Sequence, residues 1–131
     1  MVIYLDTSAF VKLVWQEQES DALWSYISAR PETGHISSRL LTLEARRAAL
    51  RSQAGLLPRI DIALERVGLV DVTAAVMESA SRIPTPELRS LDAIHLATAL
   101  MLQQDVDVMI TYDQRLADAA SASGVAVVAP R

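Results

Sequence analysis

The chain has 131 residues, of which 51% are hydrophobic, and its formal net charge is −4. This length fits a single domain over residues 1–131 with a real core, and the apolar content excludes a disordered chain. The acidic balance argues against a protein that holds nucleic acid by overall charge alone, although bound divalent cations would reverse the sign of an acidic site. The absence of cysteine excludes disulfides, thiolate nucleophiles and cysteine-based zinc sites.

The N-terminal apolar run Val2–Leu5 is broken by Asp6 and then by Lys12. Such a run is a poor signal peptide and a good first strand. The sequence contains no stretch typical of a transmembrane helix. We therefore expect a cytoplasmic protein.

Short apolar runs between turn residues predict five strands. They are expected at Val2–Leu5, His35–Ser37, Leu69–Val72, Val106–Thr111 and Val125–Val128. A first helix, capped by Thr7 or Ser8, carries Phe10 to Trp15. Further helices are expected at Ser20–Ala29, Ser38–Gln53, Arg59–Val67, Thr73–Arg82, Leu91–Gln104 (capped by Ser90) and Asp113–Ser123.

In the helix Ser20–Ala29, the side chains of Leu23, Trp24 and Ile27 are expected to point inward. Strands that alternate with helices predict an α/β protein with three layers, α/β/α. The central sheet should be mostly parallel, with four to five strands.

Four acidic residues are the candidate catalytic residues: Asp6, Glu44, Asp92 and Asp113. Asp6 and Asp113 directly follow strands, and Asp92 lies in the first turn of a helix. In a βαβ unit a helix begins over the edge where the strands end, so these three acids should meet there. Glu44 sits less than two turns into its helix and can lean over the same edge. Open α/β sheets bind their ligands at this edge.

A cluster of carboxylates restricts which ligands the site can bind. Two like charges ~4 Å apart repel by ~4 kcal/mol at an effective dielectric near 20, so the acids must raise one another's pKa or bind cations. Oxygen ligands favour Mg²⁺ or Mn²⁺, which can activate water and neutralise charge on a phosphate. Any one acid alone would be interpreted as a solvated or helix-capping residue. Only their convergence predicts a metal-dependent phosphodiesterase.

Four segments carry a resemblance to a known family: Tyr4–Ala9, Ser37–Arg47, Leu88–Ala99 and Thr111–Leu116. Each contains one of the four acids. Together, in this order and spacing, they resemble the PIN-domain family, and more narrowly the VapC toxins of bacterial type II toxin–antitoxin modules. The likeness covers essentially the whole chain.

The resemblance implies a PIN-like fold and a Mg²⁺-dependent endoribonuclease that cleaves structured RNA, often transfer or ribosomal RNA. It also implies a homodimer and a VapB-like antitoxin that blocks the active site. In the expected mechanism, Asp6, Asp92 and Asp113 hold Mg²⁺, for which Mn²⁺ can substitute. Glu44 coordinates or orients the attacking water, and cleavage leaves a 5′-phosphate and a 3′-hydroxyl.

Accessory roles are open to two interpretations each. Ser8 and Thr111 can orient carboxylates or waters, or simply cap a helix and end a strand. Arg47 and Arg51 lie on nearly the same helical face as Glu44 and can grip RNA phosphates, form a solvated face or pair with Glu44. His95, one turn after Asp92, is better explained as a core or supporting histidine than as a metal ligand.

Two other functions compete with the nuclease. A catalytically silent PIN-like module would bind RNA or a protein partner without cutting, but no acid of the set is missing. A phosphohydrolase of the haloacid-dehalogenase type would need a second aspartate two residues after Asp6, where Ser8 stands.

Overall fold

The structure is a computed structural model that describes residues 1–131, and it contains one sheet of five strands. The strands are β1 (Val2–Leu5), β2 (Gly34–Ser38), β3 (Gly68–Val70), β4 (Val106–Ile110) and β5 (Val127–Val128). They lie in the order β3-β2-β1-β4-β5, and every neighbouring pair is parallel. The expected five strands are confirmed, and the sheet is wholly rather than mostly parallel.

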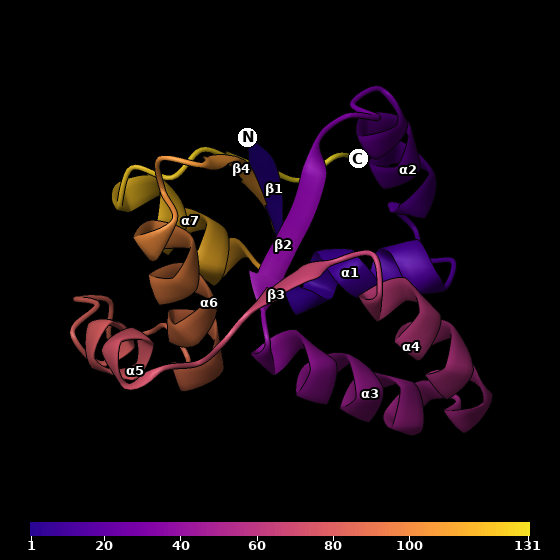
Figure 1. Ribbon diagram of the computed structural model, residues 1–131, viewed down its shortest axis with the longest axis horizontal. Coiled ribbons are helices and arrows are strands. Elements are labelled where there is room, and N and C mark those ends of the chain that lie inside the picture. The colour runs from indigo at the N-terminus through magenta and orange to yellow at the C-terminus, as the bar shows by residue number, and fades with distance from the viewer.

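Seven α-helices and one 3₁₀ turn connect the strands. They are α1 (Thr7–Val14), α2 (Ser20–Ser28), α3 (Leu40–Ser52), η1 (Ala54–Leu56), α4 (Leu57–Leu64), α5 (Ala74–Ser81), α6 (Ser90–Met101) and α7 (Gln114–Ala122). Figure 1 shows α5, α6 and α7 on one side of the sheet and α1, α2 and α4 on the other. The predicted α/β/α architecture is thus confirmed. No helix is both long and apolar enough to cross a membrane.

The central strand β1 is buried on both faces, as expected of a parallel sheet covered by helices. Ile3 and Leu5 pack in one apolar cluster with residues of α1 and α2. Tyr4, which points to the opposite face, packs in another cluster with residues of α6 and α7. Because successive side chains of a strand alternate between its faces, this short segment anchors both helical layers.

Three local expectations were wrong. Asp6, and not Thr7 or Ser8, is the N-cap of α1, because its backbone is still extended (φ −81°, ψ 178°) and its carboxylate accepts from Ala9 N–H. Helix α6 begins at Ser90 after Arg89, and Ser90 does not cap it.

The third error concerns Trp24, which is 46% exposed although Leu23 and Ile27 are buried. Positions 23 and 27 are one turn apart and share a face, whereas position 24 is turned ~100° away from 23. The helical period therefore buries two of these three side chains and leaves the indole at the surface.

The chain order of the strands identifies where a ligand can bind. From β1 the chain adds β2 and β3 on one side, then crosses to place β4 on the other side of β1. Ligands of open α/β sheets bind at such a reversal, beyond the carboxyl ends of the strands. Asp6 follows β1 and Thr111 follows β4 at this point.

Candidate active site

Asp6 is held rigidly at the end of β1. It is 3% exposed, and its Oδ1 accepts from Ala9 N–H at 3.0 Å and from Ser8 Oγ at 2.7 Å. Its Oδ2 accepts from Thr111 Oγ1 at 2.6 Å. Burial raises the pKa of Asp6, and nearby His95 and these hydrogen bonds oppose that rise. The structure therefore places both predicted accessory hydroxyls, Ser8 and Thr111, on this carboxylate.

Asp113 directly precedes α7 and uses its two oxygens differently. Its Oδ1 accepts from Leu116 N–H at 3.0 Å and so caps the helix. Its Oδ2 faces Arg89, whose Nη2 lies 3.5 Å away. Asp113 is therefore the N-cap of α7, as considered from the sequence, but capping uses only one of its two carboxylate oxygens.

Asp92, in the first turn of α6, lies against the same arginine. Its Oδ2 is 3.7 Å from Arg89 Nε. Burial raises the pKa of Asp92, and repulsion from Asp113 and, more weakly, from Asp6 adds to the rise. Asp92 is thus repelled by two other predicted acids at one edge of the sheet, and Arg89 lies against Asp92 and Asp113.

Glu44 extends from the second turn of α3 toward α1 and α6. Its Oε1 accepts from Thr7 Oγ1 at 2.6 Å and from His95 Nε2 at 2.7 Å. Burial alone would raise the pKa of Glu44, but the hydrogen bond and electrostatic attraction of His95, with the bond from Thr7, lower it overall. No hydrogen bond reaches the other oxygen, Oε2.

The side chains do not form a preassembled cage in which three or more acids or histidines hold a metal. Protein donors occupy both oxygens of Asp6. The donor chemistry nevertheless fits a hard divalent cation, because the site offers carboxylate oxygens and no sulfur. Repulsion from Asp113 already raises the pKa of Asp92, and the exposed Arg89 lies against both carboxylates.

The arginines of helix α3 form no ion pair or hydrogen bond with the four candidate catalytic acids. Arg47 and Arg51 are exposed and form no ion pair, so the alternative in which they pair with Glu44 is not observed. Their neighbour Arg46 is bound instead to Asp61 of α4 at 3.0 Å. Arg47 and Arg51 are therefore free to meet a ligand.

Sequence reasoning missed the part played by Thr7, which was expected only to cap α1. The cap is Asp6, and the Thr7 hydroxyl bonds to Glu44 instead. The one available signal was its position directly after a strand-ending acid. His95 was expected to be a core or supporting residue, and its ring bridges Tyr4 and Glu44.

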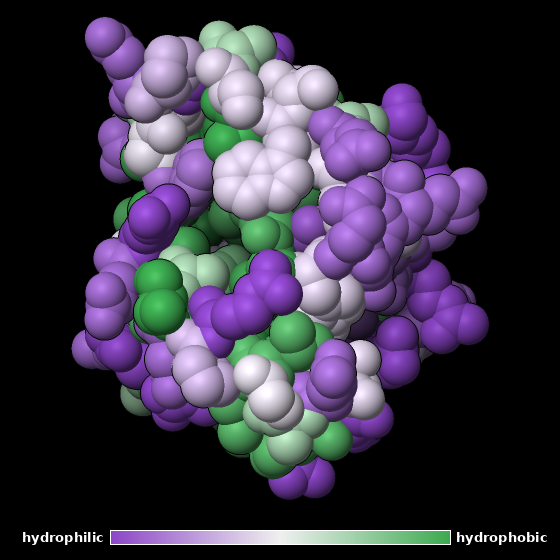
Figure 2. Space-filling view, turned by 90° about the vertical axis from the view of Figure 1, so that its right-hand side faces the viewer, coloured by the Kyte–Doolittle hydropathy of each residue, from purple (hydrophilic) through white to green (hydrophobic).

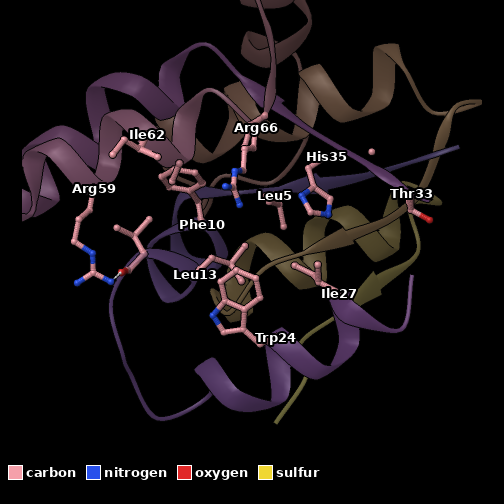
Figure 3. Close-up of a pocket in the computed structure, with 14 residues that line it drawn as sticks. Leu5, Phe10, Leu13, Trp24, Ile27, Thr33, His35, Arg59, Ile62 and Arg66 are labelled. Atoms are coloured by element: carbon pink, nitrogen blue, oxygen red, sulfur yellow. Dashed lines mark hydrogen bonds between the residues drawn. The ribbon is translucent and has the colours of Figure 1, made fainter. Parts of the chain in front are cut away.

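A second feature lies away from the acids. A groove of about 520 Å³, with a mostly apolar lining, runs between α1, α2 and α4. Figure 2 shows this side of the molecule hollowed, with hydrophobic surface inside and hydrophilic groups around it. In Figure 3, Trp24 and Ile27 of α2 face Arg66 across the groove, and Arg59 lies at its α4 end.

Comparisons with known proteins agree with this fold. Residues 3–122 match the PIN domain family. The chain is 43% identical over 131 residues to Ribonuclease VapC35 and 44% identical over 128 residues to Ribonuclease VapC46, both of Mycobacterium tuberculosis. Each alignment covers 98% of this chain and 97% of the relative.

Solved structures give the same architecture. The VapBC2 structure from Rickettsia felis, bound to a promoter DNA fragment, matches with a TM-score of 0.77 and 13% identity, covering 100% of both chains. Mycobacterium tuberculosis VapC20, described as a sarcin-ricin loop cleaving toxin, matches with a TM-score of 0.74 and 20% identity, covering 98% of this chain and 99% of the other. The resemblance seen in the four motifs is confirmed: the chain belongs to the PIN-domain family and, within it, to the VapC ribonucleases.

Proposed function

We propose that this chain, as a single PIN domain, is a Mg²⁺-dependent endoribonuclease and the toxin of a type II toxin–antitoxin module. The proposal rests on the linkage of Asp6 to Asp113 through Thr111 and of Asp113 to Asp92 through Arg89, in a chain whose relatives are named ribonucleases. Structured RNA in the cytoplasm, transfer or ribosomal, is the proposed substrate. The description of VapC20 as cleaving the sarcin-ricin loop supports this substrate class.

In the proposed site, Asp6, Asp92 and Asp113 would hold Mg²⁺, for which Mn²⁺ can substitute. The bound ion would supply an activated water and neutralise charge on the scissile phosphate. Ser8 and Thr111 keep the Asp6 carboxylate in place through the bonds described above. Glu44 orients the attacking water through Oε2, since Oε1 is occupied by protein donors.

Arg47 and Arg51 are proposed to contact RNA phosphates. Both are exposed on α3, the helix that carries Glu44, and neither is engaged by an acid. Arginines in this position can fix the backbone of a substrate without reading its sequence. Arg47 and Arg51 also provide positive charge on α3, in a chain whose net charge is negative.

The test of the function is RNA cleavage by purified protein with Mg²⁺, with EDTA, and in the Asp92→Asn variant. The proposal expects products only for wild type with metal. Cleavage that is equal in wild type and Asp92→Asn would overturn it. Binding of RNA without products at any Mn²⁺ concentration would instead favour the silent module.

A VapB-like antitoxin is the proposed partner, and its proposed binding site is the apolar groove between α1, α2 and α4. The solved neighbours include toxin–antitoxin assemblies, among them a toxin–antitoxin complex from Klebsiella pneumoniae. Large exposed apolar side chains, Trp24 and Ile62, line the groove, and Arg59 and Arg66 add positive charge. An amphipathic segment with acidic residues beside its apolar face would complement this lining.

The groove is tested by Trp24→Asp in a co-purification experiment with a co-expressed VapB-like antitoxin. The variant should lose the antitoxin and keep RNA cleavage, because no acid of the site lines the groove. Met101→Asp is the matched control, since Met101 is similarly exposed but lies outside the groove. Retention of the antitoxin by Trp24→Asp would contradict the assignment.

A homodimer is the proposed state of the chain without antitoxin. Exposed apolar side chains on α3, Leu43 and Leu50, are consistent with a contact between copies. Sedimentation of wild type at several concentrations tests this state, and a monomer throughout the micromolar range would contradict it.

A further inference from the structure

His95 forms a buried chain of hydrogen bonds that leads from the sheet to Glu44. It is 1% exposed. Its Nδ1 lies 2.8 Å from the Tyr4 hydroxyl, and its Nε2 lies 2.7 Å from Glu44 Oε1. The rings of Tyr4 and His95 pack edge to face, with centroids 5.8 Å apart. This histidine therefore has both nitrogens engaged and little freedom to turn.

The direction of these bonds follows from their neighbours. The backbone N–H of Ser38 donates to the Tyr4 hydroxyl oxygen at 3.1 Å. An ionised carboxylate can only accept, so the bond to Glu44 Oε1 places a proton on His95 Nε2, and in the neutral ring Nδ1 then accepts from the Tyr4 hydroxyl. A histidine that accepts at Nδ1 carries its proton on Nε2, the nitrogen that faces the Glu44 carboxylate. Glu44 and Tyr4 therefore favour the same tautomer, in which Nε2 donates to Glu44.

Two donors then converge on one oxygen of Glu44. Thr7 Oγ1 and His95 Nε2 both bond to Oε1, at 2.6 and 2.7 Å. Two bonds from different elements, α1 and α6, fix the rotation of the carboxylate. Oε2 is left without a protein partner and available to a ligand.

We propose that His95 is a positioning residue: held as the Nε2–H tautomer by Glu44 and Tyr4, it fixes Glu44 so that Oε2 is presented to the water that attacks the RNA. This inference rests on the proposed nuclease function. It assigns His95 no contact with substrate and no exchange of a proton during the reaction.

A matched pair of variants separates positioning from packing. His95→Leu fills the buried space but has no donor, whereas His95→Gln keeps an N–H donor on a flexible side chain. We expect His95→Leu to lower kcat by roughly 10–100-fold, the usual effect of removing an orienting partner, with little change in KM for RNA. His95→Gln should recover much of the kcat.

A structural role would give a different result. If His95 only completes the core, both variants should lose melting temperature together, and Gln should not rescue kcat. Either that pattern or full activity of His95→Leu would overturn the inference. An inactive wild type would instead reject the nuclease function, so the two failures are distinguishable.

A spectroscopic test needs no activity. In ¹⁵N-labelled wild type, the imidazole correlation spectrum should show His95 with its proton on Nε2 and a bare Nδ1. Tyr4→Phe removes only the hydroxyl from which Nδ1 accepts, so the Nδ1 resonance should shift while the proton stays on Nε2 facing Glu44. A wild-type proton on Nδ1, or a spectrum that Tyr4→Phe leaves unchanged, would overturn the proposal.

Discussion

Asp6 serves two purposes, and different substitutions should separate them. As the N-cap of α1 it accepts from Ala9 N–H, and it also accepts the hydroxyl protons of Ser8 and Thr111. Asp6→Ala removes the cap, which costs ~1 kcal/mol, and strands two hydroxyl protons at ~1 kcal/mol or more each. At acidic pH the free energy of unfolding should therefore fall by about 3 kcal/mol, and near neutral pH removal of the carboxylate that burial disfavours offsets part of this loss. Asp6→Asn keeps a good capping oxygen.

Because Asp6 is buried, the difference in stability between wild type and Asp6→Asn should depend on pH. Because the pKa of Asp6 is raised above its ordinary value of 3.8, the folded protein disfavours the ionised carboxylate. The stabilising contribution of this group is present at acidic pH and is lost as the pH rises through its folded pKa. Asp6→Asn carries no charge, so its stability relative to wild type should improve as the pH increases above 3.8.

The assay is urea unfolding followed by circular dichroism, with thermal melting in parallel. A loss of about 3 kcal/mol corresponds to a fall of roughly 10 °C in the melting temperature of a domain of this size. Asp6→Asn should melt at or above the wild-type temperature at neutral pH while lacking RNA cleavage. An Asp6→Ala protein as stable as wild type at acidic pH, or an Asn variant as unstable as Ala, would refute the reasoning.

Two further predictions concern the acids and the basic face of α3. Asp92→Asn should raise the melting temperature of the metal-free protein near neutral pH, because it removes a charge that burial and Asp113 disfavour; a clear fall would contradict the repulsion. Arg47→Ala should weaken RNA binding and reduce the salt dependence of affinity by about one unit of log–log slope per lost phosphate contact. Arg46→Ala is the control, since Arg46 is already bound to Asp61, and equal losses in a filter-binding titration would argue against a phosphate contact at Arg47.

The sequence was sufficient to predict the architecture and the edge at which the acids lie. Buried apolar runs mark parallel strands, and the geometry of βα units brings the ends of β1 and β4 beside the start of α6. These features depend on local patterns repeated along the chain. They do not require knowledge of any single side-chain contact.

The contacts within the site could not be predicted in this way. Glu44 and His95 are separated by 51 residues, and Tyr4 and His95 by 91. Whether such pairs meet depends on strand register and side-chain rotamers. The hydrophobic periodicity of each element contains no information about either. Thr7 illustrates the problem, since its hydroxyl could bond to backbone as a cap or, as observed, to an acid of another helix.

Arg89 provides the last test, because its guanidinium lies where an added cation would have to compete with it. It is 3.7 Å from Asp92 and 3.5 Å from Asp113, and its side chain is 72% exposed. Exposed ion pairs of this kind contribute only ~0.5 kcal/mol each, so Arg89 should oppose metal binding by about 1 kcal/mol. Arg89→Gln should therefore bind Mn²⁺ about fivefold more tightly in isothermal titration calorimetry.

Varying the salt concentration provides a control for the Arg89→Gln measurement. Screening weakens interactions between exposed charges, so the advantage of Arg89→Gln should shrink as the ionic strength rises from 0.01 M toward 1 M. Metal affinity that is unchanged in Arg89→Gln at low salt would show that the guanidinium does not rest against Asp92 and Asp113 in solution. Weaker affinity would show that Arg89 supports the metal rather than competing with it.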